Sequence, residues 1–163
     1  MRIHIAGNYQ GYELARELEQ WLAANPANEV IWHGTAELDD EDDYPLYAFR
    51  IGQAVIEDED NALEVRGILV GGSGAGETIA TNKVAGARAV FGASVDYVTE
   101  GRAHANASIV VIGAHYTNLV QAKALVEAII DTKFMNILDD ARRIVNTNEY
   151  ESSKTIEGWM ITG

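Results

Sequence analysis

The chain has 163 residues, with 25 acidic and 12 basic side chains and a formal net charge of −13. This charge argues against duplex DNA and anionic membranes as partners, because phosphate contacts need clustered Lys and Arg. The absence of cysteine excludes disulfides, a thiolate nucleophile and a cysteine metal site. The apolar runs are too short for a bilayer span, and the first residues, MRIHIAG, lack a signal-peptide pattern, so we expect a cytoplasmic protein.

Short apolar segments typical of strands alternate along the chain with amphipathic segments typical of helices. In the first helical segment, Leu14, Leu18, Trp21 and Leu22 recur at the spacing of one helix face. Pro45 fits the first turn of the second helix, where a missing N–H costs nothing. The predicted strands cover residues 2–7, 29–34, 66–72, 87–92 and 107–114. The predicted helices cover residues 11–24, 44–58, 77–84, 94–103, 118–131 and 134–149.

Five strands that are apolar throughout, each followed by a helix, predict a parallel sheet with helices on both faces. We therefore expect an α/β fold, a doubly wound, Rossmann-like sheet with strand order 2-1-3-4-5. Residues 1–150 are expected to form a single domain. Residues 151–163 are expected to form a C-terminal tail, in which Trp159 packs either on the domain or on a partner subunit.

Two acidic runs, ELDDEDD at residues 37–43 and EDED at residues 57–60, are interpreted as solvated loops without a chemical role. His4 and His33 have no second histidine or carboxylate at ligand spacing in the sequence, so both are interpreted as structural. We predict no metal site from these residues.

A ligand is expected beyond the carboxyl ends of the strands, where the strand order reverses. In the expected order this point lies between the first and third strands. The loops that leave these strands, GNYQGYE at residues 7–13 and GGSGAGE at residues 71–77, would then face each other across one crevice. The glycines allow successive N–H groups to point inward at the start of the next helix, which favours an anion or a developing oxyanion.

Other interpretations of the glycine-containing loop stay open. It lacks the Lys-Ser/Thr pair of a P-loop, and no acidic residue ends the next strand where a ribose would need one, which weighs against a nucleotide. A tight turn without any ligand is also compatible with the loop. Glu77 by itself could simply be a first-turn glutamate that complements the helix dipole.

Four segments together resemble one known family: RGILVGGSGAGETIATNK at 66–83, DYPLYA at 43–48, GYEL at 11–14 and RAHANA at 102–107. They are similar to the ribose-5-phosphate isomerase B family of aldose–ketose isomerases, which includes galactose-6-phosphate isomerases. The resemblance runs from about Met1 to Arg143. Gly71 stands where many members have a catalytic cysteine, and Glu77 where others have an apolar residue, as in the actinobacterial branch, whose base is the glutamate.

The resemblance implies proton transfer between C1 and C2 of a sugar through a cis-enediolate, without a cofactor or a metal. Glu77 would be the general base, and Ser73 would act with the backbone N–H groups of the loop to stabilise the oxyanion. The loop residues in this expected oxyanion site are Gly72, Gly74, Ala75 and Gly76. Tyr44 matches a tyrosine of the family's site.

His104 precedes the last strand, so it belongs at the amino end of the sheet, away from the crevice of its own subunit. The resemblance implies that it opens the sugar ring in the crevice of a neighbouring subunit, so we expect a homodimer, or a tetramer, with shared active sites. Asn106 would either hold the His104 turn or contact sugar hydroxyls across the interface. As a lone histidine, His104 would otherwise be a surface or capping residue.

Several residues depart from the family pattern. Asn8 and Tyr9 replace an Asp-His pair after the first strand, and His115 stands where an arginine is common. Of two C-terminal arginines that usually grip the phosphate, the first is replaced by Asp139 and the second is kept as Arg143. Because each such bond is worth about 1.5 to 3 kcal/mol, phosphate binding should be weakened by several kcal/mol. The substrate is therefore either a sugar phosphate, or an unphosphorylated or differently phosphorylated sugar; a non-catalytic sugar-binding homologue is the remaining alternative.

Overall fold

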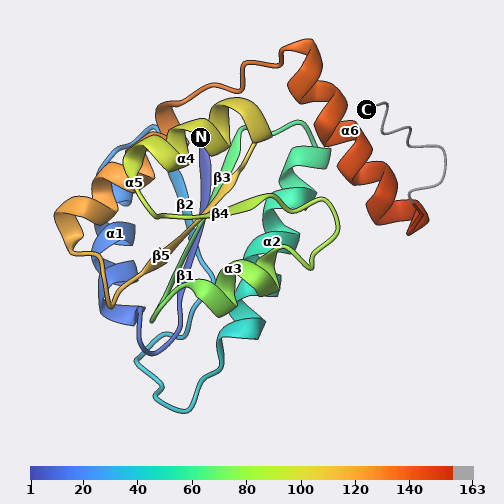
Figure 1. Ribbon diagram of the computed structural model, residues 1–163. Helices are drawn as coiled ribbons and strands as arrows, with labels where there is room; N and C mark the ends of the chain where they lie inside the picture. The colour runs from blue at the N-terminus through green and yellow to red at the C-terminus, as the bar shows by residue number, and fades with distance from the viewer. Residues whose placement is uncertain (156–163) are drawn as a thin grey trace.

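The computed structural model of the protein describes residues 1–155 (Figure 1). The strands are β1 (Arg2–Gly7), β2 (Glu29–Trp32), β3 (Val65–Gly71), β4 (Ala89–Phe91) and β5 (Ile109–Gly113). The helices are α1 (Tyr12–Ala23), α2 (Tyr44–Asp60), α3 (Ala75–Thr81), α4 (Val95–Ala105), α5 (Leu119–Asp131) and α6 (Leu138–Ser153). No helix in this part of the chain is long and apolar enough to cross a bilayer.

All strand pairs are parallel, and the order across the sheet is β2-β1-β3-β5-β4. The predicted α/β fold, a doubly wound five-stranded sheet, is confirmed, and its order reverses between β1 and β3 as expected. The last two strands lie in exchanged positions relative to the expected 2-1-3-4-5. The burial of the two strands explains the exchange: every residue of β5 is buried, whereas β4 has three residues, two of them only partly buried, and suits the edge.

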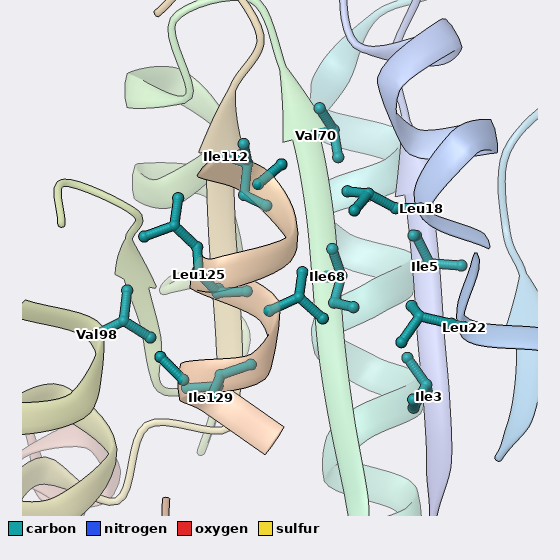
Figure 2. Close-up of a cluster of buried hydrophobic side chains, with 14 of the residues drawn as sticks. Ile3, Ile5, Leu18, Leu22, Ile68, Val70, Val98, Ile112, Leu125 and Ile129 are labelled. Atoms are coloured by element: carbon teal, nitrogen blue, oxygen red, sulfur yellow. The ribbon is translucent and has the colours of Figure 1, made fainter. Parts of the chain in front are cut away.

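Each face of the sheet carries its own hydrophobic cluster. On one face, side chains of β1, β3 and β5 pack against α1, α4 and α5, and Figure 2 shows Ile5 and Ile68 turned toward this layer beside Leu18 and Leu22. On the other face the strands pack against α2 and α3. Because successive residues of a strand point to opposite faces, an unbroken apolar strand supplies both layers at once. The sheet is therefore held between two apolar layers.

A polar chain joins β1 and the residue after β2 to the end of α2. The acidic run at residues 57–60 belongs to this helix and includes the buried Asp58, which corrects its interpretation as a solvated loop. Nε2 of His4 lies 2.8 Å from Oδ2 of Asp58, and Nδ1 of His4 lies 2.7 Å from Nε2 of His33. Arg2 donates a 2.8 Å hydrogen bond to the other carboxylate oxygen of Asp58. Burial opposes the ionisation of Asp58, but the hydrogen bonds from His4 and Arg2 outweigh it and lower the pKa of this carboxyl group. Both histidines thus sit in a structural contact between elements.

The last helix differs from its predicted bounds. It begins at Leu138 rather than near residue 134, because the backbone of Asn136 has a left-handed φ of 49° and the N–H of Met135 bonds to the carbonyl of Ala103. It continues to Ser153, so the predicted tail begins inside it. Residues 156–163, which include Trp159 and most of that tail, lie outside the described residues. Figure 1 shows α6 outside the layers formed by the sheet and its covering helices.

Candidate active site

The candidate site lies at the carboxyl edge of the sheet, where the adjacent strands β1 and β3 end. The loop after β1 and the loop after β3 meet there with the start of α2, around a pocket of about 290 Å³. The pocket is lined by Asn8, Tyr9, Gln10, Asp42, Asp43, Tyr44, Ser73, Gly76 and Glu77. The structure therefore brings together five of the residues predicted from the sequence to act at one site, namely Asn8, Tyr9, Tyr44, Ser73 and Glu77, along with one glycine of the loop.

Glu77 lies in the first turn of α3 and is only 4% exposed. Its carboxylate fills the space beside Gly71: a Cβ added to Gly71 would lie 1.8 Å from Oε1 of Glu77. A residue with a side chain at position 71 and this placement of Glu77 therefore exclude each other. The sequence departs from the common family pattern at both position 71 and position 77, and the structure links the two departures. The Glu77 carboxylate occupies the space where a side chain at position 71 would begin.

The amide of Asn8 orients this carboxylate. Asn8 is 3% exposed, and its Oδ1 accepts a 3.1 Å hydrogen bond from the N–H of Gly11. The N–H donor fixes the direction of the amide, so that Nδ2 faces Glu77 and donates a 3.3 Å hydrogen bond to Oε1. Among residues 1–155 this is the one hydrogen bond to the Glu77 carboxylate.

The glycine-containing loop leaves several backbone donors unused. Gly74 has a φ of 80°, a conformation that L side chains rarely adopt, and it turns the chain from β3 into α3. The N–H of Ala75 bonds to Oγ of Ser73 at 3.2 Å. Within the described chain, the N–H groups of Ser73, Gly74, Gly76 and Glu77 have no hydrogen-bond partner. Free donors grouped beside a buried carboxylate suit an anion that forms next to a base.

Close approaches pack the loop against its neighbours. A Cβ on Gly76 would lie 2.6 Å from the Tyr44 ring, and one on Gly72 would lie 2.1 Å from Oε1 of Gln10 and 3.0 Å from Cε1 of His115. His115 thus lies beside the loop, and its N–H bonds to the carbonyl of Gly72, although it does not line the pocket itself. Because these two glycines have no side chain, Tyr44 can approach the backbone at Gly76 and Gln10 can approach the backbone at Gly72.

The acidic run at residues 37–43 is not wholly a solvated loop, which corrects the interpretation from the sequence. Asp42 and Asp43 line the pocket. Asp42 accepts hydrogen bonds of 2.9 Å from the N–H of Tyr9 and from the hydroxyl of Tyr47, so it ties the loop before α2 to the loop after β1. Burial and this bond to Asp42 raise the pKa of Tyr47 to about 12.

The remaining predicted residues lie at the other end of the sheet. His104, near the end of α4, and Arg143, in α6, line a separate pocket of about 780 Å³ and both contact Asp140. Asn106 ends α4 with a left-handed φ of 51°, and its Oδ1 accepts a hydrogen bond from Arg102. This bond lies within the turn that follows His104.

Sequence analysis missed several polar residues in these pockets. Gln10, Asp42 and Asp43 line the pocket of Glu77, and no local sequence pattern indicates these loop contacts. Asp140 is 4% exposed and lies between His104 and Arg143. The only local signal for Asp140 was its spacing of three residues from Arg143, which is common for surface ion pairs on helices.

Comparison with known proteins identifies the family of the chain. The sequence profile of a family described as Ribose/Galactose Isomerase matches residues 3–147, and the chain belongs to this family. Ribose-5-phosphate isomerase B from Mycobacterium tuberculosis is 34% identical over 151 residues, which cover 93% of this chain and 90% of that protein. Ribose-5-phosphate isomerase B from Escherichia coli is 31% identical over 133 residues, 82% of this chain and 85% of that protein.

Solved structures show the same fold. Ribose-5-phosphate isomerase B from Clostridium thermocellum superposes with a TM-score of 0.85 at 31% identity, over 95% of this chain and all of that one. The enzyme from Mycoplasma genitalium with bound ribulose 5-phosphate has a TM-score of 0.84 at 26% identity, over 93% and 97% of the two chains. The expected family and the enzyme class that it implies, a sugar isomerase, are confirmed.

Proposed function

We propose that the protein is an aldose–ketose isomerase that interconverts a sugar phosphate of the ribose 5-phosphate and ribulose 5-phosphate type, with Glu77 as the general base. The observation that carries this proposal is the buried Glu77 carboxylate beside four free backbone N–H groups, in a pocket where the strand order reverses. Relatives named ribose-5-phosphate isomerase B, one of them with ribulose 5-phosphate bound, support the choice of substrate class.

In the proposed reaction, the carboxylate and the backbone donors of the pocket have separate roles. The Glu77 carboxylate takes the proton from C2 of the open-chain aldose, and the C–H electron pair forms the C1–C2 double bond while negative charge develops on O1. The free backbone N–H groups of Ser73, Gly74, Gly76 and Glu77, with the Ser73 hydroxyl, stabilise this charge, and each such donor is worth about 2.7 to 4 kcal/mol. A proton then passes from O2 to O1, and Glu77 returns its proton to C1, which yields the ketose.

Ring opening requires a second group, and His104 is proposed for it. Within one chain His104 lies at the amino end of the sheet, whereas Glu77 lies at the carboxyl end, and the two line separate pockets. We therefore propose a homodimer, or a tetramer, in which His104 acts in the crevice of a neighbouring subunit. Arg143 lies in the same pocket as His104 and would enter the neighbouring site with it.

A second candidate substrate is an unphosphorylated sugar. The residues that line the pocket of Glu77 include the carboxylates of Asp42 and Asp43 and, in the described part of the chain, no Lys, Arg or His. Such a lining repels a phosphate group, so the phosphate of a sugar phosphate has to lie outside this pocket. Arg143, the retained arginine, already donates to Asp140.

The central test is Glu77→Gln in an NMR assay of isomerisation. We expect a loss of about 10² to 10⁴-fold, the usual contribution of a general base. Glu13→Gln is a matched control, because Glu13 is an exposed first-turn glutamate of α1 and complements a helix dipole without lining the pocket. An unchanged rate for Glu77→Gln rules out Glu77 as the base.

A panel of free and phosphorylated pentoses and hexoses tests the substrate. Ribose 5-phosphate is expected to be converted far better than ribose. The reverse preference selects the unphosphorylated substrate, and binding without turnover of any sugar selects the non-catalytic alternative.

Mixing two inactive variants tests the shared site. A hybrid dimer of Glu77→Gln and His104→Asn subunits contains one site with both substitutions and one site with neither. Random mixing should therefore restore about a quarter of the wild-type activity. Hybrids that form but stay inactive would exclude sharing between subunits.

A further inference from the structure

Asp140 is a buried carboxylate with two donors, and the proposed reaction does not yet use it. It lies in the first turn of α6 and is 4% exposed. Its Oδ2 lies 2.8 Å from Nδ1 of His104, and its Oδ1 accepts a 2.9 Å hydrogen bond from Nη1 of Arg143. The His104 and Arg143 side chains remain 49% and 66% exposed, so both extend from the buried carboxylate toward solvent.

We propose that Asp140 is a positioning residue for ring opening, which fixes the ring orientation and the tautomer of His104 so that Nε2 is presented to the substrate. This inference rests on the proposed function, because it assigns Asp140 to the ring-opening step of that reaction. Asp140 does not touch the reacting atoms and acts through His104.

The tautomer follows from the donors around Asp140. An ionised carboxylate only accepts hydrogen bonds, so the proton of the neutral imidazole lies on Nδ1, and Nε2 is left as a proton acceptor. The guanidinium of Arg143 only donates, and it occupies the other carboxylate oxygen. Nε2 can then take the proton of the anomeric hydroxyl of the sugar and pass it to the oxygen of the sugar ring. The imidazole does not have to turn for this transfer.

The burial of Asp140 favours a single placement of the carboxylate. Asp140 is the one buried residue of α6 in the described chain, and the bond to His104 links α6 to α4. A buried carboxylate without partners would be costly, whereas here both oxygens are bonded. The same carboxylate holds Arg143, so the two side chains proposed to enter the neighbouring site share one anchor.

The substitution Asp140→Asn tests the inference because an amide cannot serve both donors. Its oxygen is drawn to the guanidinium of Arg143, which leaves the NH₂ group facing Nδ1 of His104. Nδ1 must then accept, and the imidazole proton moves to Nε2, the wrong tautomer for a base at that atom. The volume of the side chain hardly changes.

A substrate that needs no ring opening separates this role from a general defect. Ribose 5-phosphate is mainly a closed ring, whereas 4-deoxyribose 5-phosphate stays an open aldehyde, because it lacks the 4-hydroxyl that closes the ring and its 5-oxygen carries the phosphate. For Asp140→Asn we expect kcat/KM to fall about 10 to 100-fold with ribose 5-phosphate, below the full range of acid–base contributions. With the open-chain analogue it should stay within about twofold, because this aldehyde reaches Glu77 without ring opening.

Asp96→Asn is the matched control, since Asp96 is an exposed aspartate in the first turn of α4 and lines neither pocket. It should leave kcat/KM unchanged for both substrates. An equal loss with both substrates for Asp140→Asn overturns the inference and assigns Asp140 a structural role only. Glu77→Gln lowers the conversion of both substrates if the proposed function holds, so the two proposals fail in distinguishable ways.

A measurement on the wild-type protein keeps the inference testable if Asp140→Asn does not fold. Long-range ¹H–¹⁵N NMR spectra distinguish the two neutral tautomers of a histidine. We expect the neutral His104 ring to carry its proton on Nδ1. A proton on Nε2, or a mixture of tautomers, overturns the inference whatever the substrate is.

Discussion

Replacing Gly71 by alanine should separate the activity of the protein from its stability. A Cβ at position 71 would lie 1.8 Å from Oε1, 2.2 Å from Cδ and 2.9 Å from Cγ of Glu77. Ordinary van der Waals contact begins near 3.4 Å, so the carboxylate has to retreat by at least about 1.6 Å. The nearest atoms belong to the end of a flexible side chain, which can move while the backbone stays in place.

The expected magnitudes follow from this displacement. A shift of about 1 Å at a reacting group costs on the order of 10²-fold in rate, so Gly71→Ala should lose at least that much activity. The free energy of unfolding should change by less than about 1 kcal/mol, because alanine restricts the unfolded chain and offsets part of the loss of the Asn8 bond to Glu77.

Isomerase kinetics and urea denaturation of the same samples test the reasoning. The double variant Gly71→Ala with Glu77→Gln should be no slower than Glu77→Gln alone, since both changes remove the same base. Activity of Gly71→Ala within about twofold of wild type would refute the spatial exclusion between residue 71 and the carboxylate. A loss of stability of several kcal/mol would show that the backbone, rather than Glu77, has to move.

Two further predictions concern pH. Burial, with the charges of His4 and Arg50, lowers the pKa of His33 from 6.5 to about 4, so His33 contributes stability that is present above pH 6.5 and lost as the pH falls toward 4. The full shift corresponds to roughly 3 kcal/mol, and screening by solvent at this partly exposed ring reduces it to about 1 to 2 kcal/mol. His33→Gln should remove that loss in urea denaturation at pH 7 and pH 4.5, and an unchanged loss contradicts the assignment. Asn8→Asp places a second carboxylate about 3.3 Å from Glu77, so the acid limb of the kcat/KM profile should move up by about one pH unit; an unmoved limb excludes Asn8 as a partner of the base.

Most secondary structure could be predicted because it depends on local patterns. The apolar residues of β1 and the helical spacing of Leu18 and Leu22 reappear as the buried layers of the sheet and α1. The exchange of β4 and β5 could not be predicted, since both segments read as apolar strands. Their order depends on which strand is buried enough to lie inside the sheet, with a neighbouring strand on each side, and which one lies at the edge.

The site was predicted where two strand ends determine it. Parallel strands place their carboxyl ends at one edge, so Asn8 and the loop after Gly71 had to meet once β1 and β3 were adjacent. Asp42 escaped prediction because its hydrogen bonds to Tyr9 and Tyr47 depend on how the loop before α2 folds back. Asp140 escaped for the same reason, because its contact with His104 joins residues 36 positions apart.

The sequence by itself determined the strands, the helices and the glycine-containing loop, because hydrophobic periodicity and backbone freedom act over a few residues. Only the tertiary structure decided that the Glu77 carboxylate occupies the space beside Gly71 and that Asp140 anchors His104 and Arg143. Such contacts are set by distances between elements far apart in the chain, and those distances exist only once the sheet and its helices have packed.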